Sequence, residues 1–130
     1  MIDTSALVAL LLDEPEASLL RAAMAGDSVR LVSTVSVLEA TCVLTSRIGP
    51  AAVFELAAFL NDFHMEQVQF DAEQLAVAQR AWMVYGKGRH KAGLNFGDCA
   101  SYALAQSQHA PLLFIGNDFS RTDIAAALRR

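Results

Sequence analysis

Short apolar runs that alternate with longer helical stretches most constrain what this chain can fold into. Four such runs are predicted to be strands: residues 1–2, 29–33, 68–70 and 112–115. Between them the apolar residues recur with a helical period, and glycine or proline marks the breaks. Strands that are separated by helices usually pair in parallel and are covered on both faces. The sequence therefore predicts an α/β fold with a mainly parallel sheet.

The expected helices carry start and stop signals. Thr4 or Ser5 is predicted to cap the first helix, Ser33 or Thr34 to cap the third, and Gly26 to end the second. The predicted helices cover residues 4–12, 17–25, 34–48, 51–62, 71–85 and 97–108, and a short helix is expected to close the chain. With 130 residues, of which 54% are hydrophobic, we expect one domain over residues 1–130 with a sizeable core.

Composition argues against several classes of protein. The chain has no run of eighteen apolar residues and no signal peptide, so we expect a cytoplasmic protein without a membrane span. Cys42 and Cys99 lie far apart, and the three histidines lack the spacing of zinc ligands. The net charge of −4 argues against a broad, nonspecific grip on nucleic acid. It leaves room for an acidic site that meets phosphates through bound cations.

Four carboxylates stand at the ends of apolar elements or inside them. Asp3 and Asp118 follow the first and last predicted strands, where the functional groups of parallel α/β sheets gather. Glu39 and Asp98 lie in otherwise apolar helical stretches, with no lysine or arginine at a local spacing that would pair with them. Converging acids repel one another, and Mg²⁺ or Mn²⁺ relieves that repulsion. Each acid taken singly also fits a cap, a turn or a solvent-facing position, so the prediction rests on the set.

The order of four motifs resembles a known family over essentially the whole chain. They are "DTSAL" from residue 3, "SVLEA" from residue 36, "NFGDCASYALA" from residue 95 and "LLFIGNDFSRTDI" from residue 112. The chain resembles the PIN-domain ribonucleases and, more narrowly, the VapC-type toxins of bacterial toxin–antitoxin pairs. The resemblance implies a three-layer α/β/α domain with about four to five strands. It also implies an endoribonuclease that uses Mg²⁺ or Mn²⁺.

The resemblance also implies a role for each acid. Asp3 and Asp98 would be the principal metal ligands, and Asp118 would bind metal directly or through water. With Glu39 they would form the catalytic set. A water that the metal activates would attack the scissile phosphate in line. Asp118 or Glu39 would orient that water or accept its proton.

Residues around the acids receive supporting roles. Ser5 in the "DTS" turn is predicted to support the pocket. Asp123 matches a recurring acid of the family, and a role as a cap or turn residue fits it equally. A glycine-punctuated basic loop and a nearby arginine are candidates for phosphate contacts, and a solvated surface loop is the alternative. These candidates are Lys87, Arg89, Lys91 and Arg121.

Partners are also expected. The segment from Leu7 to Met24 carries more apolar residues than one helix pair needs for a single core, which predicts an exposed groove. The alternative is that these helices simply pack on the sheet. The resemblance implies an RNA substrate, a second copy of the chain and a VapB-like antitoxin. The rival function is a catalytically silent PIN-like module that uses the acidic pocket to dock a partner.

Overall fold

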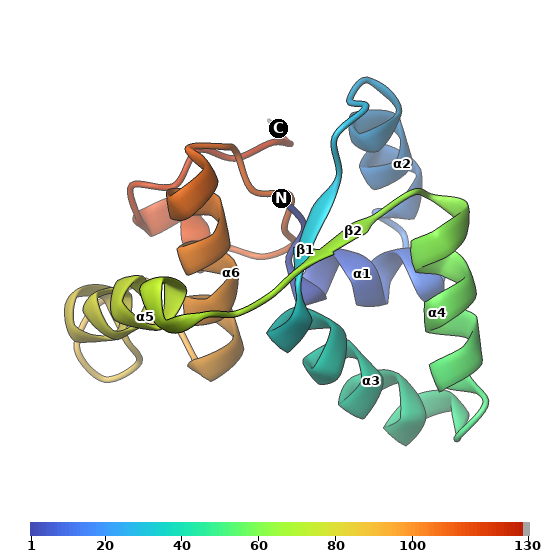
Figure 1. Ribbon diagram of the computed structural model, residues 1–130, viewed down its shortest axis with the longest axis horizontal. Coiled ribbons are helices and arrows are strands. Elements are labelled where there is room, and N and C mark those ends of the chain that lie inside the picture. The colour runs from blue at the N-terminus through green and yellow to red at the C-terminus, as the bar shows by residue number, and fades with distance from the viewer. Residues whose placement is uncertain (129–130) are drawn as a thin grey trace.

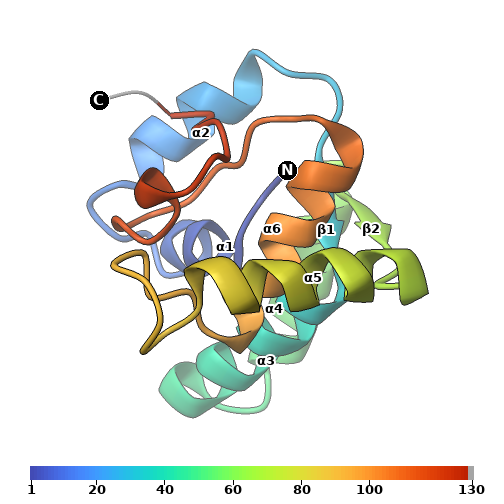
Figure 2. The ribbon, with the colours of Figure 1, turned by 90° about the vertical axis from the view of Figure 1, so that its left-hand side faces the viewer.

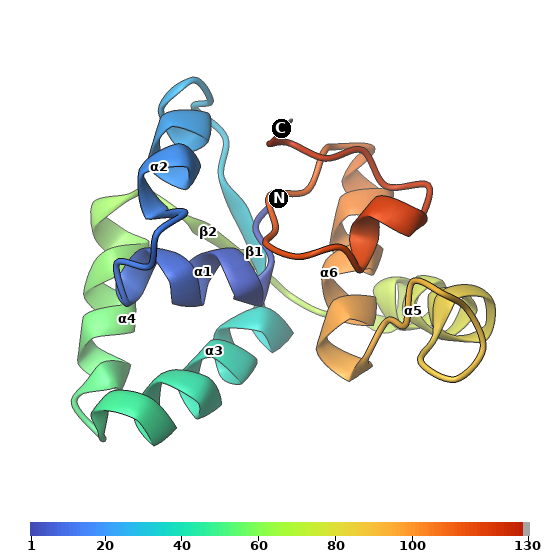
Figure 3. The same ribbon diagram turned by 180° about the vertical axis from the view of Figure 1, so that it is seen from behind.

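A parallel sheet lies between two groups of helices in the computed structural model, which describes residues 1–128 (Figure 1). Helices α1 to α4 lie on one side of the strands, and α5 and α6 lie on the other (Figures 1 and 3). This arrangement confirms the predicted three-layer α/β/α fold. The elements in chain order are α1 (Thr4–Leu11), α2 (Ala17–Ala25), β1 (Leu31–Ser33), α3 (Thr34–Ile48), α4 (Ala52–Asp62), β2 (Glu66–Val68), α5 (Ala72–Tyr85), α6 (Phe96–Gln108) and the 3₁₀ helix η1 (Phe119–Arg121).

The sheet is built from two short strands and a series of parallel bridges. In the β1–β2 pair, Val32 stands opposite Gln67. On the other side of β1, Ile2 forms parallel bridges with both Val32 and Leu113. The Ile2 N–H donates to the carbonyl of Leu31 at 2.9 Å, and a further bridge joins Leu112 to Ala126. The predicted first and last strands are therefore present as one- or two-residue contacts that widen the sheet beyond β1 and β2.

Two predicted elements differ from the structure. The strand expected at 68–70 lies two residues earlier, because Phe70 has left the ladder and its N–H donates to the hydroxyl of Thr34 at 3.3 Å. The expected closing helix is limited to the three residues of η1. After η1 the chain extends again, and Ala126 joins the edge of the sheet because its neighbours exchange backbone hydrogen bonds with Leu112.

Helix α1 begins at Thr4 as predicted, but its cap is Asp3, the reading that this acid fits when it is taken singly. Asp3 is extended and is itself the N-cap, since its side chain accepts a hydrogen bond from the Ser5 N–H. Thr4 and Ser5 already belong to the helix, so the prediction that one of them caps it is wrong. Ser33 caps α3 as predicted and accepts from the Val35 N–H.

The sheet separates two apolar clusters. Leu113 packs in the first cluster, with α1 to α4, and Leu112 packs in the second, with α5 and α6. Successive residues of an extended segment face opposite sides, so this one segment supplies both cores. Most of α1 is buried in the first cluster, including Leu7 and Leu10. The alternative that the early helices pack on the sheet therefore accounts for this face of α1.

The loop that follows α5 is exposed at the end of that helix. Helix α5 crosses in front of α6 when the molecule is turned by 90°, and the loop after α5 projects from its end (Figure 2).

None of the helices in residues 1–128 is long and apolar enough to cross a membrane.

Candidate active site

The structure brings the four predicted acids to the carboxyl end of the sheet. Asp3 caps α1, Asp98 lies in the first turn of α6, and Asp118 stands at the start of η1. Glu39 is in the middle of α3 and reaches the start of α6, where its carboxylate lies against Gly97. Four elements that are distant in sequence thus converge on one site.

Asp98 and Asp3 are the two buried acids of this group, and the pKa of Asp98 reflects its surroundings. Burial is the largest cause and raises the pKa of Asp98 from 3.8 to about 7. A hydrogen bond from the backbone of Asn95 works in the opposite direction. The negative charges of Asp3, Asp118 and Glu39 raise the pKa further, because all three face Asp98.

The carboxylate of Asp3 is held on both of its oxygens. Its Oδ2 accepts hydrogen bonds from the N–H of Ser5 at 3.0 Å and from the Ser5 hydroxyl at 2.7 Å. Its Oδ1 accepts from the hydroxyl of Ser101 at 2.5 Å. The Ser5 oxygen in turn accepts from the N–H of Ile115 at 2.9 Å. Ser5 therefore links Asp3 to the last bridge segment of the sheet, a contact consistent with its predicted supporting role.

A capping box orients Asp98. The Asn95 side chain accepts from the Asp98 N–H at 2.9 Å, and the Asp98 Oδ2 accepts from the Asn95 N–H at 2.9 Å. Two N–H groups at the helix start are satisfied reciprocally, and the side chain of Asp98 is held in one direction. The same contact leaves Oδ1 of Asp98 for a ligand.

Gly97 is required by the position of Glu39. A β-carbon at residue 97 would overlap both carboxylate oxygens of Glu39. The glycine of the "FGD" motif thus allows α3 to bring an acid against the first turn of α6. Its backbone is not in the left-handed region, so the requirement is one of space and not of backbone conformation.

The remaining predicted residues lie around this centre. Asp118 is exposed, and it makes no capping hydrogen bond in the part of the chain that the structure describes. Asp123 accepts a hydrogen bond from the Tyr102 hydroxyl at 2.7 Å, so its contact is with the second core and with none of the four acids. Burial and this hydrogen bond together raise the pKa of Tyr102.

The predicted basic residues are exposed and lie together. Lys87, Arg89 and Lys91 project from the loop after α5. The loop is closed at its base, because the Lys87 N–H donates to the carbonyl of Leu94 at 2.9 Å. Arg121 donates to the carbonyl of Lys91 at 3.2 Å, which fastens η1 to the loop. These contacts close the loop and hold Arg121 against its end.

The acids lack positive partners within residues 1–128. The ion pairs of these residues are Arg21 with Asp13 and Arg47 with Glu14, all outside the site. A cation would meet an all-oxygen donor set, which suits Mg²⁺ and Mn²⁺. No three His, Cys, Asp or Glu side chains in the described range are gathered closely enough to hold one ion together. An ion at this site would therefore take some of its ligands through water.

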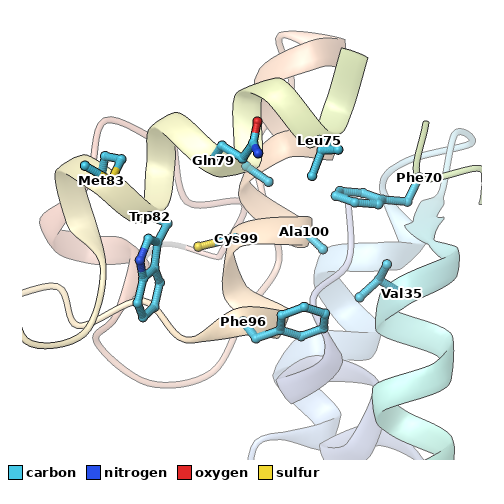
Figure 4. A pocket seen from close by; sticks show the side chains of 10 residues that line it. Val35, Phe70, Leu75, Gln79, Trp82, Met83, Phe96, Cys99 and Ala100 are labelled. Atoms are coloured by element: carbon cyan, nitrogen blue, oxygen red, sulfur yellow. The ribbon is translucent and has the colours of Figure 1, made fainter. Parts of the chain in front are cut away.

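An apolar groove lies on the side of α6 that faces α5. Its volume is about 540 Å³, and it opens between α5, α6 and the start of α3 (Figure 4). Burial, and then the charge of Asp98, raises the pKa of the Cys99 thiol to about 11, which favours the neutral thiol in the wall of the groove. The larger side chains that line the groove are Phe70, Leu75, Gln79, Trp82, Met83 and Phe96.

Sequence reasoning missed several residues that shape the site. The capping box of Asn95 and Asp98 has a readable spacing of three residues. Ser101, one turn after Asp98, has a weaker signal, because residues three apart share a helix face. The hydroxyl of Ser36 lies within hydrogen-bond distance of that of Ser101, and Gly97 leaves space for Glu39. Both contacts depend on how α3 crosses α6, and no local sequence pattern predicts that crossing.

The fold and the acidic site define a class of protein. The PIN domain model matches residues 1–125, and the chain belongs to the PIN-domain family. Ribonuclease VapC of Mycolicibacterium smegmatis is 52% identical over 126 residues, which cover 97% of this chain and 98% of that protein. Ribonuclease VapC30 of Mycobacterium tuberculosis is 50% identical over 125 residues, covering 96% of this chain and 95% of that one. The predicted resemblance is confirmed.

A solved structure agrees with the fold. The crystal structure of Mycobacterium tuberculosis VapC20, described as a sarcin–ricin loop cleaving toxin, superposes with a TM-score of 0.77. The superposition covers 95% of both chains at 20% sequence identity. This likeness supports the architecture of the sheet and its helices.

The raised pKa of Asp98 predicts how stability changes with pH. An acid whose pKa rises on folding from 3.8 to about 7 stabilises the folded state fully below pH 3.8, and this contribution is lost as the pH rises through about 7. In chelator, the wild type should lose more free energy of unfolding between about pH 4 and pH 8 than Asp98→Asn, whose amide does not titrate. Urea unfolding at both pH values measures the difference, and equal losses would contradict it.

The contact of Gly97 with Glu39 predicts an unusual variant. Gly97→Ala should keep or raise the free energy of unfolding, since alanine favours a helix over glycine by about 1 kcal/mol. The new β-carbon should displace the Glu39 carboxylate and lower RNA cleavage by up to about a hundredfold. Gly26→Ala is the matched control, because nothing stands within 4 Å of its β-carbon position. An active Gly97→Ala protein would show that Glu39 need not stand there.

Proposed function

We propose that this PIN domain is an endoribonuclease, the toxin of a toxin–antitoxin pair, and that it requires Mg²⁺ or Mn²⁺. The observation that carries the proposal is the convergence of Asp3, Glu39 and Asp118 on buried Asp98, with no ion-pair partner in the described residues. The high identity to proteins named VapC ribonucleases supports the same conclusion. We further propose that it acts on cytoplasmic RNA.

The donor set supports a divalent cation. Asp3, Asp98 and Asp118 would hold the ion, with part of the contacts through water. When bound, the ion would neutralise the acids and stabilise the charge that develops on the scissile phosphate. The hydrogen bonds of Ser5 and Asn95 orient the first two carboxylates before any ligand arrives.

The side chains of the protein would then manage the proton and the phosphate. Asp118 is exposed and Glu39 is half-buried against Gly97, so both carboxylates can face an attacking water. One of them would orient this water and accept its proton as it attacks in line. The exposed loop with Lys87, Arg89 and Lys91 would hold the phosphates on either side of the cleaved bond.

A second copy of the chain is the proposed occupant of the apolar groove. Phe96 is 83% exposed and Met83 is 59% exposed, and both line that groove with Trp82. Large aromatic and thioether side chains on one surface are typical of the core of a protein interface. A homodimer would remove this surface from water.

A VapB-like antitoxin is proposed to bind elsewhere. A shallow groove between α1, α2 and α4 is lined by Leu11, Phe59 and Phe63, with Arg21 and Asp62 at polar positions. Its apolar floor and charged residues suit an amphipathic helix. The early apolar segment thus keeps part of its predicted role, although most of α1 is buried.

Metal-dependent cleavage of RNA tests the proposed function. Purified protein should cut total cellular RNA with Mg²⁺ or Mn²⁺ and be inactive in chelator. Asp98→Asn should lower the rate of RNA cleavage by more than roughly 10- to 100-fold, the effect of removing a residue that hydrogen-bonds to a metal ligand. Asp62→Asn, which removes an exposed acid of α4, is the matched control and should stay active. Folded protein that is free of antitoxin and cuts no RNA would favour the silent binding module.

Charge removal tests the basic loop. A triple variant with Lys87→Ala, Arg89→Ala and Lys91→Ala should bind RNA more weakly. Its plot of log affinity against log salt should be less steep by up to about 2, at about 0.7 for each phosphate contact. Arg21→Ala is the control, because its guanidinium pairs with Asp13 away from the site. Fluorescence anisotropy at several salt concentrations measures both slopes, and unchanged slopes would make this a solvated surface loop.

Oligomeric state tests the groove. The wild type should have twice the 14.0 kDa mass of one chain, and Leu75→Asp should be a monomer. A charge inside the interface would have to be desolvated without a partner. Leu19→Asp, at a comparably exposed position on α2, should remain a dimer. Light scattering after size exclusion gives the masses, and a monomeric wild type or a dimeric Leu75→Asp protein would contradict the proposal.

A further inference from the structure

Two buried serines form a hydrogen-bonded chain that ends on the carboxylate of Asp3. The hydroxyl of Ser101 lies 2.5 Å from Oδ1 of Asp3, and the hydroxyl of Ser36 lies 3.1 Å from that of Ser101. Ser36 is 0% exposed and Ser101 is 1% exposed. Neither serine reaches solvent, so both hydroxyls depend on each other and on Asp3 for their hydrogen bonds.

The direction of the chain follows from its donors. An ionised carboxylate only accepts, so the single hydroxyl hydrogen of Ser101 points at Asp3. Ser101 then has only its lone pairs left for Ser36, and Ser36 must donate to it. Hydrogen bonds that run in one direction strengthen one another, most of all in a buried setting. The hydrogen bonds therefore run in one direction, from Ser36 through Ser101 to Asp3.

The placement of the two serines connects three acids. Ser101 follows Asp98 by three residues on α6, and Ser36 precedes Glu39 by three residues on α3. Residues three apart lie on one face of a helix. Each of these two helices thus supplies, from one face, an acid of the site and a serine of the hydrogen-bonded series. The relative position of α3, α6 and the start of α1 is fixed by side chains that end on one carboxylate.

The two sides of Asp3 are held differently. Ser5 holds Oδ2 from within the same turn, while Ser101 holds Oδ1 from another helix. Ser5 restrains the carboxylate through Oδ2 alone, because both of its hydrogen bonds go to that oxygen. The contact from Ser101 restrains Oδ1 as well and leaves that oxygen a lone pair in a set direction, while Oδ2 already accepts two hydrogen bonds.

We propose that Ser101 is a positioning residue, backed by Ser36, that fixes the plane of the Asp3 carboxylate for the divalent cation and the phosphate. This inference rests on the proposed function, since it assumes that Asp3 binds the ion. It concerns a part of the site distinct from the four acids and from Ser5. Neither serine touches the substrate, so each acts only through Asp3.

The test uses the full chain with Ser101→Ala, Ser36→Ala and the double variant. Ser101→Ala should lower kcat for RNA cleavage by about 10- to 100-fold and leave KM nearly unchanged, as the loss of an outer partner of a ligand does. Titration calorimetry with Mn²⁺ alone should show a similar loss of affinity without RNA present. Ser36→Ala should have a smaller effect, and the double variant should match Ser101→Ala, because Ser36 works only through Ser101.

Leu60→Val controls for stability. Leu60 is buried on α4, outside the site, and its shortening lowers stability without touching Asp3. This variant should keep the kcat and Mn²⁺ affinity of the wild type. Wild-type kcat and Mn²⁺ affinity in Ser101→Ala would overturn the inference, as would losses that multiply in the double variant. A wild type that cleaves no RNA would instead overturn the proposed function, which separates the two failures.

Discussion

A single residue near the start of the chain, Ile2, joins the two halves of this molecule. It bridges Val32 on one side and Leu113 on the other, so it occupies the centre of the sheet between both helical layers. Its own side chain is buried in the first apolar cluster. Because the next residue is Asp3, the pairing of Ile2 also fixes where the first carboxylate stands and where α1 begins. The strands of the sheet are short, yet the bridge of Ile2 to Leu113 brings Asp3 and the segment before Asp118 to the same edge.

The site is a balance between repulsion and support. Burying Asp98 beside Asp3, Asp118 and Glu39 is unfavourable: burial, and then these three charges, raise its pKa to about 7. The surrounding residues offset part of it through hydrogen bonds, a capping box and space beside Gly97. These contacts hold the acids apart in set directions but leave their charge uncompensated. The arrangement is unfavourable alone and would become favourable with the proposed cation bound, which is the behaviour expected of a preorganised metal site.

Much of this could be predicted from the sequence, and the remainder has physical reasons. The alternating periods gave the layers, and the ordered motifs gave the family and the four acids. Strand bounds were less accurate, because Ile2 and Leu113 need only one or two residues to join the sheet. Asp3, Thr4 and Ser5 all favour the position of the first cap, and only the backbone torsions decide for Asp3. The contact of Ser36 with Ser101 could not be predicted, since it depends on the crossing of two helices.

The order in which the chain passes through the sheet also sets when the site can exist. Asp3 stands at one end of the sequence, while Asp98, Ser101 and Asp118 stand near the other. The two ends of the chain must therefore come together before the site is assembled, and closing so long a loop slows folding. A partly folded chain would then have almost no activity. A ribosome making this protein is itself built of RNA. While only the first helices have been made, the growing chain lacks the partners of Asp3 and has no competent centre beside that RNA.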